Sequence, residues 1–266
     1  MNNISWNPLG FIHRFLDGSV PDNESHPAIS SRRLDWDSAY FNADIHRLDY
    51  IPDGISPENF LTFLPAKKPG RKTYVFSEVP TEAVSVFRLL ASKGFTLVET
   101  RLTYFHLLDN LPQMNRHSRP AEQQDLPFLK KTASEAVNQF DRYHSDPFFS
   151  EKQAAEYLET YIENCLNGFA ELVFVPELET SPASFAALSR VSIAGTSIYR
   201  IPLTAALPEN RGWHYHLCLA ALHYAKSKNA PALVMTTQSG NKAVIHNCEK
   251  LGFKLGSIFH IFSKEL

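Results

Sequence analysis

The sequence predicts an α/β fold with a mixed sheet, spread over two domains. Short apolar runs bounded by turn residues, such as KTYVFSEV at 72–79, alternate with longer segments whose apolar residues recur at helical spacing. A polar stretch with three prolines, 109–127, separates two such series of elements and has the composition of a linker. We therefore expect a smaller α/β domain at 1–115 and a second one at 116–266.

The N-terminal half begins with an irregular leader of about 30 residues, judged from its turn-rich composition. A strand-like alternation follows around Ile45, Leu48 and Tyr50. The next expected elements are a strand at 72–79, a helix between Pro80 and Gly94, and one long strand or a strand pair at 95–108.

The C-terminal half continues the alternation. Helices are expected at 125–140, at 148–168 between Ser150 and Gly168, at 213–228, and at 241–252 with Asn241 as its cap. Strands are expected at 169–177, 183–192, 196–207, 231–237 and 257–264, and the second and third of these turn at 194–195. The apolar run at 231–237 is typical of a buried strand with a parallel neighbour.

Charge and cysteine content limit the partners. The 28 acidic and 26 basic residues nearly cancel, so no overall field would attract nucleic acid or an anionic membrane. Cys165, Cys218 and Cys248 are widely spaced, which argues against a disulfide framework or a zinc site, and no metal is expected. Without a signal or membrane-spanning pattern, we expect a soluble cytoplasmic protein whose oligomeric state, a homodimer included, is open.

The segment IPLTAALPENRGWHYH, 201–216, has features of an anion site. A strand that runs into a helix N-terminus presents unpaired N–H groups and the positive end of a dipole, which suit a pyrophosphate. Pro202 cannot donate to a ladder, so we expect it at an edge or a bulge. A bulge there would splay this strand from the next one.

This order of elements, with PENRG before one helix and NKAVIHNCEKLGF near the end, resembles the GCN5-related N-acetyltransferases (GNATs). The segments 33–48 and 140–168 are similar to bacterial acyltransferases of the dTDP-fucosamine acetyltransferase type. The resemblance implies a GNAT fold with a splayed central sheet and acetyl-CoA as acyl donor. It also implies, as acceptor, the amino group of a nucleotide-linked 4-amino-4,6-dideoxy sugar used in lipopolysaccharide biosynthesis. The first domain would lie on the acceptor side, with a degenerate GNAT unit as one interpretation.

The resemblance also implies where the donor binds. In the family the loop reads Arg/Gln-x-x-Gly-x-Gly/Ala, whereas here Arg211 is followed by His214 and His216 at the glycine positions. The two rings either block the cradle or swing outward and contact phosphate as imidazolium groups. The residues implied for the cofactor are Thr204, Ala206, Arg211, Gly212, His214, His216 and Asn241.

Two proton-transfer roles follow from the same resemblance. Cys248 stands where the family places the tyrosine that protonates the leaving sulfur, although a buried cysteine is more often simple packing. His246, Asn247, Tyr215 and His216 are alternative donors. For the general base, the stretch FDRYHSDPFF points to His144, against the alternative that its aspartates only serve turns.

The acceptor would be held by Trp36, Asp37, Asp141 and Arg142, with Arg32 and Arg33 as further phosphate contacts. Trp36 is alternatively a core anchor and Asp37 a helix cap. Two other functions stay open. One is a catalytically degenerate binding module, which is favoured by the histidines at the glycine positions of the loop and by the cysteine at the tyrosine position. The other is an acyltransferase whose donor is an acyl carrier protein. A carrier's phosphopantetheine lacks the adenosine diphosphate that the loop would otherwise hold.

Overall fold

A computed structural model describes residues 30–52, 54–136, 138–193 and 196–266. The predicted leader, except Ser30, and the turn at 194–195 lie outside the described residues. The chain forms two compact units. Unit 1 comprises Met1–Leu102, Phe140–Ser150 and Ser257–Leu266, and unit 2 comprises Thr103–Gln139 and Glu151–Gly256. The units therefore interleave along the chain, whereas the prediction was a single boundary after residue 115.

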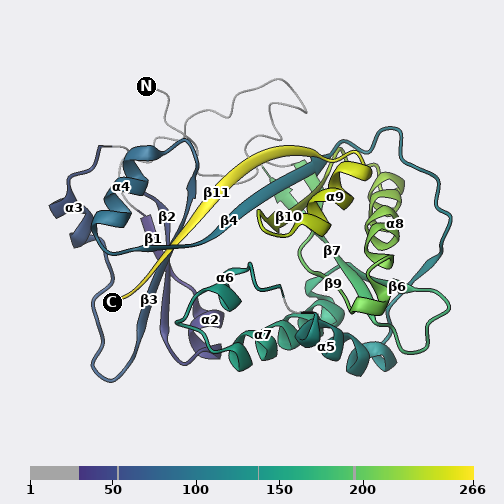
Figure 1. Cartoon of the computed structure of the whole chain (residues 1–266), viewed down its shortest axis with the longest axis horizontal. Helices are drawn as coiled ribbons and strands as arrows, with labels where there is room; N and C mark the ends of the chain where they lie inside the picture. Colours follow the sequence, from purple (N-terminus) through teal and green to yellow (C-terminus); the bar gives the residue numbers. More distant parts are fainter. Residues whose placement is uncertain (1–29, 53, 137, 194–195) are drawn as a thin grey trace. The chain divides into compact units, whose positions relative to one another are not determined.

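Unit 1 is built on a sheet with the strand order β1-β2-β3-β11-β4, in which β2 and β3 are parallel and β3 and β11 antiparallel (Figure 1). Its strands are β1 (Ser30–Arg33), β2 (Asp44–Tyr50), β3 (Thr73–Pro80), β4 (Thr96–His106) and β11 (Lys254–Glu265). Its helices are α2 (Asp35–Tyr40), α3 (Pro57–Thr62), α4 (Val84–Ser92) and α6 (Arg142–Ser145). β4 and β11 each continue into unit 2.

The two faces of the unit 1 sheet are covered differently. Val75 and Val79 pack with Leu90 of α4 and Phe60 of α3 in one apolar cluster. On the alternate residues, Tyr74 and Phe76 contact the segment 140–150, where Arg142 lies over the Phe76 ring. The period of two in β3 therefore separates an aliphatic core from a more polar one.

Unit 2 has the strand order β4-β10-β8-β7-β6-β5, and β9 pairs with β7. Its strands are β5 (Ser118–Pro120), β6 (Leu172–Pro176), β7 (Ser184–Ile193), β8 (Thr196–Ile201), β9 (Thr204–Ala206) and β10 (Leu233–Gln238). Its helices are α5 (Leu126–Glu135), α7 (Glu151–Asn164), α8 (Trp213–Ser227) and α9 (Lys242–Lys250), with short helical turns η1 (Gln123–Asp125), η2 (Cys165–Phe169) and η3 (Pro208–Asn210). β8 and β10 are parallel, as the sequence predicts for 231–237.

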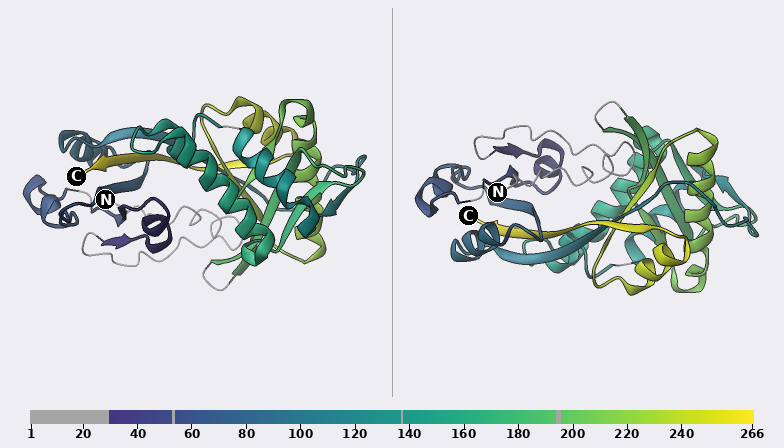
Figure 2. Two further views of the ribbon diagram at one scale, coloured as in Figure 1. Left: turned by 90° about the horizontal axis from the view of Figure 1, so that it is seen from below. Right: turned by 90° about the horizontal axis from the view of Figure 1, so that it is seen from above.

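Helices cover both faces of the unit 2 sheet (Figure 2). Val173 and Val175 of β6 pack against Leu129 of α5 and Ile162 of α7. Phe174, which lies between those valines, contacts Tyr224 of α8 on the opposite face. The α/β class and the mixed sheet are thus confirmed.

Several short elements differ from the prediction. The segment 109–127 is not only a linker, because β5 pairs with β6 there and α5 begins at Leu126. The segments 34–41 and 57–62, for which no helix was expected, contain α2 and α3. Of the two alternatives for 95–108, the structure shows the single strand. Tertiary pairing decides such short elements more than local propensity does.

No helix in the described ranges combines the length and the apolarity needed to cross a membrane.

Candidate functional site

A β-bulge interrupts the strand that leads to the predicted anion site. β7 pairs with β8 as Ser189↔Arg200 and with β9 as Ala186↔Thr204. The β8–β9 side therefore has one residue more than β7 across this step, which defines a bulge at Pro202 and Leu203. Of the two positions predicted for Pro202, an edge or a bulge, the structure shows the bulge.

Beyond the bulge, two residues turn their backbone groups away from β7. Ala187 N–H donates to Leu203 O at 2.9 Å and Leu207 N–H donates to Ala183 O at 2.9 Å. Leu203, Ala205 and Leu207 are therefore the residues whose N–H and C=O groups point to β7. The N–H and C=O groups of Thr204 and Ala206 must point to the other side of β9.

No strand pairs with that other side of β9 in the part of the chain that the structure describes. β10 pairs with β8 from Leu233 to Met235 and then continues to Gln238 without pairing with β9. Thr237 Oγ1, in this continuing part, is buried and lacks a hydrogen-bond partner among the described residues. The two strands thus separate where free backbone donors and acceptors are present.

The N-terminus of α8 follows directly. Gly212 precedes the helix without a side-chain cap, and both Arg211 and Gly212 are exposed. The first N–H groups of α8 have no carbonyl partner within the helix, as at any helix N-terminus. Unpaired N–H groups at the positive end of a helix dipole attract anions. Glu179 fixes the preceding turn, because its carboxylate accepts hydrogen bonds from Asn210 Nδ2 at 2.8 and 2.9 Å.

His214 does not point into this anion site. Its ring is buried, and Asn247 Nδ2 of α9 donates a hydrogen bond to its Nδ1 at 2.9 Å. Burial lowers the pKa of His214 to about 4, so the ring is neutral near pH 7. The expectation that this side chain swings outward as an imidazolium is therefore wrong, and the side chain does not block the N–H groups either.

His216 lies in a different environment on the same turn. It is half-buried, contacts the rings of Trp213 and Tyr215, and its buried Nδ1 has no partner among the described residues. Burial and the nearby Arg116 charge lower its pKa. Arg116 lies over the Trp213 ring at 5.2 Å, so this end of α8 carries a cation that the sequence analysis missed.

The last helix carries two predicted residues. Asn241 caps α9, as predicted, because its side chain accepts a hydrogen bond from Val244 N–H at 3.3 Å. Cys248 is fully buried, and burial, with a smaller effect of Glu249, raises its pKa to about 12. The thiol is therefore protonated at neutral pH. Among the alternative donors, Asn247 is engaged by His214, and His246 is exposed.

Asp141 and His144 form a dyad in unit 1. Asp141 caps the short helix α6, since its Oδ1 accepts from the N–H groups of Tyr143 and His144. Its Oδ2 accepts from His144 Nδ1 at 2.8 Å. The His144 side chain is 6% exposed, and its Nε2 has no hydrogen-bond partner among the described residues.

The neighbours of this dyad have structural contacts. The Arg142 guanidinium is buried, lies 3.8 Å from the centroid of the Phe76 ring and donates to Tyr143 Oη, so it is not the surface phosphate ligand that was expected. Asp146 is buried and accepts from Tyr74 Oη at 2.7 Å and from Ser263 Oγ. These contacts give Asp146 a structural role.

Trp36 and Asp37 lie on α2, also in unit 1. Trp36 is 43% exposed and stacks on Tyr40, so it is not a core anchor. Asp37 accepts a hydrogen bond from Tyr143 Oη at 3.2 Å and does not cap α2, whose cap residue is Leu34.

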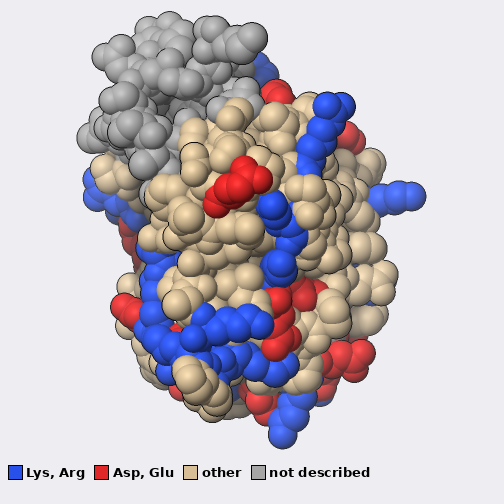
Figure 3. Space-filling view, turned by 90° about the vertical axis from the view of Figure 1, so that its left-hand side faces the viewer, with Lys and Arg blue, Asp and Glu red and all other residues tan. Residues whose placement is uncertain are grey.

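Lys and Arg side chains gather on part of the surface that Figure 3 shows from the side of α3 and α4. In this unit, Arg33, Lys68 and Arg71 surround the buried Asp44 at 3.1, 3.0 and 3.6 Å. Lys68 and then Arg33 lower the pKa of Asp44, so it is ionised. Arg33 also pairs with Asp35, so three cations against two carboxylates leave an excess of one positive charge. Arg32 pairs with Asp49.

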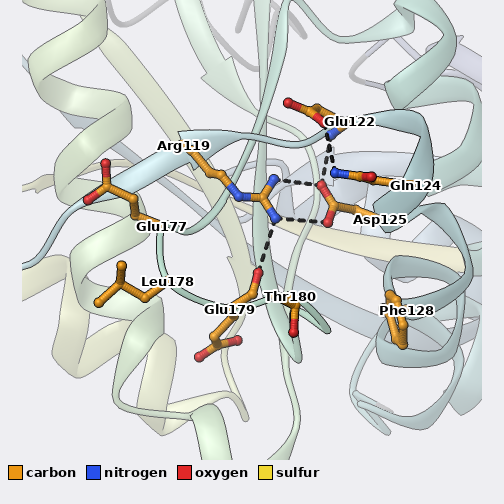
Figure 4. A pocket seen from close by; sticks show the side chains of 9 residues that line it. All are labelled: Arg119, Glu122, Gln124, Asp125, Phe128, Glu177, Leu178, Glu179 and Thr180. Carbon is orange, nitrogen blue, oxygen red and sulfur yellow. Dashed lines mark hydrogen bonds and ion pairs between the residues drawn. The ribbon is translucent and has the colours of Figure 1, made fainter.

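A pocket of about 440 Å³ in unit 2 was not predicted (Figure 4). Arg119 lies at its centre and makes two hydrogen bonds to Asp125, at 2.7 and 2.9 Å, and one to Glu179 O. The pair stands in the segment first interpreted as a linker, so only the tertiary structure shows it. In the described ranges, no group of three His, Cys, Asp or Glu residues is arranged to hold a metal ion.

No protein-family model matches the sequence, and a search of curated protein sequences finds no similar one. Solved structures do match. A GCN5-related N-acetyltransferase from Sphaerobacter thermophilus aligns with a TM-score of 0.54 and 11% identity over 90% of this chain and 76% of its own. The chain has the GNAT fold.

Two further solved structures align with most of the chain. A GCN5-related N-acetyltransferase from Kribbella flavida aligns with a TM-score of 0.51 and 12% identity, over 83% of this chain and 81% of its own. A conserved protein of unknown function from Staphylococcus epidermidis aligns with a TM-score of 0.58 and 11% identity, over 96% of this chain and 97% of its own. The GNAT alignments extend beyond the half of the chain in which the sequence resemblance was strongest.

Proposed function

We propose that this protein is an N-acyltransferase that transfers an acetyl group from acetyl-CoA to the amino group of a nucleotide-linked 4-amino-4,6-dideoxy sugar. The binding of acetyl-CoA, the donor half of the proposal, is supported by Thr204 and Ala206. Their backbone groups face away from β7 and meet no other strand in the described chain. An amide-rich pantetheine chain can pair with such an edge as an extra strand would. The N–H groups at the start of α8 then suit its pyrophosphate.

The proposed reaction needs no covalent enzyme intermediate. The neutral amine attacks the thioester carbonyl, a C–N bond forms, and the C–S bond breaks with departure of the CoA thiolate. Backbone N–H groups of β9 polarise the carbonyl, and two groups handle protons. We assign the base to His144 and the acid to Cys248, whose thiol carries a proton at neutral pH.

The acceptor half of the proposal is supported by unit 1. The positive excess around Asp44 suits a dianionic nucleotide, and the exposed Trp36 ring offers a stacking surface for a base or sugar. A GNAT fold alone does not select an acceptor, since one fold hosts many substrates. CoA release with the dTDP-linked aminosugar, compared with the same aminosugar without its nucleotide, tests this half. Equal rates would remove the nucleotide from the proposal.

Calorimetric titration with acetyl-CoA tests the donor half. We expect saturable binding by the wild-type protein and roughly tenfold weaker binding by Ala206→Pro, which deletes one N–H group that does not bond to β7. Thr204→Val is the matched control, because the Thr204 hydroxyl is occupied with Phe185 O at 2.9 Å. Its affinity should not change.

The titration also separates the alternatives. Absence of binding by the wild-type protein would leave a degenerate binding module as the better account. Weak binding of acetyl-CoA with turnover of an acetylated carrier protein would identify a carrier-dependent enzyme. An unchanged kcat for Cys248→Ala, with the affinity for acetyl-CoA retained, would remove Cys248 from the mechanism.

A further inference from the structure

The turn that leads into α8 is not fixed by its own side chains. Residues Pro208–Asn210 form the single turn η3, and neither η3 nor α8 has a side-chain cap. A short uncapped turn keeps several backbone conformations unless other contacts select one. The direction in which the first N–H groups of α8 point therefore depends on contacts with other segments.

Glu179, in the loop between β6 and β7, supplies these contacts. Its carboxylate accepts from Asn210 Nδ2 at 2.8 and 2.9 Å and from Ala183 N–H at 3.3 Å. Ala183 O accepts from Leu207 N–H at 2.9 Å, and Leu207 O accepts from Asn210 N–H at 2.9 Å. These four residues form a closed ring of hydrogen bonds that ends directly before Arg211.

Glu179 is itself held in place (Figure 4). Arg119 Nη2 donates to Glu179 O at 3.1 Å, and the same guanidinium makes two hydrogen bonds to the buried Asp125. Asp125 Oδ2 also accepts from Glu122 N–H at 2.8 Å. Because an arginine that binds a carboxylate through two hydrogen bonds has a defined orientation, this pair fixes the backbone from which the Glu179 side chain extends.

The charge of Glu179 opposes anion binding at the neighbouring turn. A carboxylate repels phosphate through space, so a residue that acted by its charge alone would weaken the binding of a pyrophosphate. A residue that holds the N–H groups in place would strengthen it. Removal of the charge therefore separates the two roles by the sign of its effect.

We propose that Glu179 is the positioning residue of the donor site, which through Asn210 holds the N-terminus of α8 for the pyrophosphate of acetyl-CoA. This inference rests on the proposed function, and all of its residues belong to unit 2. The pantetheine chain would pair with β9, which is held by β7 independently of the Glu179 side chain. Glu179 thus supports a preference for acetyl-CoA over a thioester that lacks the diphosphate.

Glu179→Gln is the first variant. An amide offers one oxygen and one NH2 group, so a donor must then face either Asn210 Nδ2 or Ala183 N–H. We expect the Kd for acetyl-CoA to rise roughly tenfold although a negative charge is removed. The Kd for acetylpantetheine, which lacks the diphosphate, should stay within about twofold. Direct and competition calorimetry measure the two values.

The reversed pair tests the contact itself. Asn210→Asp alone brings two carboxylates together, so it should weaken acetyl-CoA binding by more than about tenfold. In the double variant Glu179→Gln with Asn210→Asp, the new amide can donate to the new carboxylate while its oxygen accepts from Ala183 N–H. The Kd for acetyl-CoA should return to within about threefold of the wild-type value.

Glu177→Gln is the matched control. Glu177 is exposed, lies two residues earlier on the same loop and borders the same pocket. The substitution makes the same change of charge without touching the ring of hydrogen bonds. Its Kd for acetyl-CoA should stay within about twofold of the wild-type value.

Three outcomes would overturn the inference: unchanged or tighter binding of acetyl-CoA by Glu179→Gln, equal losses for acetyl-CoA and acetylpantetheine, or a double variant as weak as Asn210→Asp. If Glu179→Gln does not fold, Asn210→Ala carries the test, since it keeps the charge and should show the same difference between the two thioesters. A wild-type protein that binds neither thioester contradicts the proposed function. A wild-type protein that binds both equally retains the pantetheine site and overturns only the role of Glu179.

Discussion

His144 in unit 1 and His214 in unit 2 are both buried histidines with a single strong partner, and the partners impose opposite proton positions. Asp141 accepts from Nδ1 of His144, which leaves Nε2 as an acceptor. The Asn247 amide donates to Nδ1 of His214, which places the proton on Nε2. The residue type therefore says little about acid–base chemistry until the partner is known.

The two pairs also differ in how they arise. Asp141 lies three residues before His144 and holds it within one helical turn, so the sequence suffices to bring them together. Asn247 lies on α9, 33 residues after His214, and meets it only because the fold brings these two helices together. The local pair leaves His144 Nε2 without a partner among the described residues, whereas the distant pair joins two helices.

The largest expected effect is on stability in unit 2. His214→Ala removes a buried ring and leaves the Asn247 amide without its acceptor, so we expect the free energy of unfolding to fall by about 2–4 kcal/mol. His216→Ala, two residues later and half-buried, should cost less than about 1 kcal/mol. Urea unfolding of both variants measures the difference. Equal losses would mean that His214 does not link the two helices.

Asn247→Asp gives His214 the kind of partner that His144 has. The carboxylate would accept from Nδ1, so the ring shifts should report Nδ1–H in place of Nε2–H. Because a charge replaces a neutral amide beside a buried ring, the free energy of unfolding at pH 7 should fall by about 1–2 kcal/mol. A ring that keeps Nε2–H in this variant would show that its partner does not set its tautomer.

A smaller effect is expected in the pH dependence of stability. The folded state holds the pKa of His214 at about 4, below its ordinary value of 6.5, so the unfolded chain binds more protons between these values. The stability from neutral His214 is complete above pH 6.5 and is lost as the pH falls towards 4. Near pH 5.5, protonation of His214 changes the free energy of unfolding by about 1 kcal/mol per pH unit.

The test of this slope compares variants at several pH values. Unfolding of His214→Gln between pH 5 and 6.5 should show a shallower decline than that of the wild-type protein, because glutamine does not titrate. His246→Gln, at an exposed position of α9, should follow the wild-type slope. Parallel slopes for all three proteins would contradict the assignment of a buried, neutral His214.

The sequence predicted the features that depend on neighbours in the chain. The alternation of strands and helices, the break at Pro202 and the cap at Asn241 follow from backbone geometry and missing donors, which act over a few residues. The elements β1, α2, α3, α6 and β5 were missed. All are short, and β5 pairs with β6, so its stability depends on a distant strand.

The roles of Thr204, Ala206, His144 and Asp141 stay predictions, and the sequence could not orient the side chains around them. It left the His214 ring open between blocking the cradle and swinging outward. The ring in fact turns inward to Asn247, and Arg142 is buried over Phe76 rather than free to bind phosphate. These orientations depend on which surfaces become buried, and burial is a property of the packed chain.

By itself, then, the sequence predicted most of the alternation of strands and helices, an edge or a bulge at Pro202, and the cap at Asn241. Only the tertiary structure decided that residues 140–150 and 257–266 join unit 1, and which hydrogen-bond partner each histidine has. The physical reason is the distance along the sequence over which each interaction acts. Dihedral restraints and caps act between residues close in sequence, whereas desolvation and long-range hydrogen bonds exist only after distant segments have packed together.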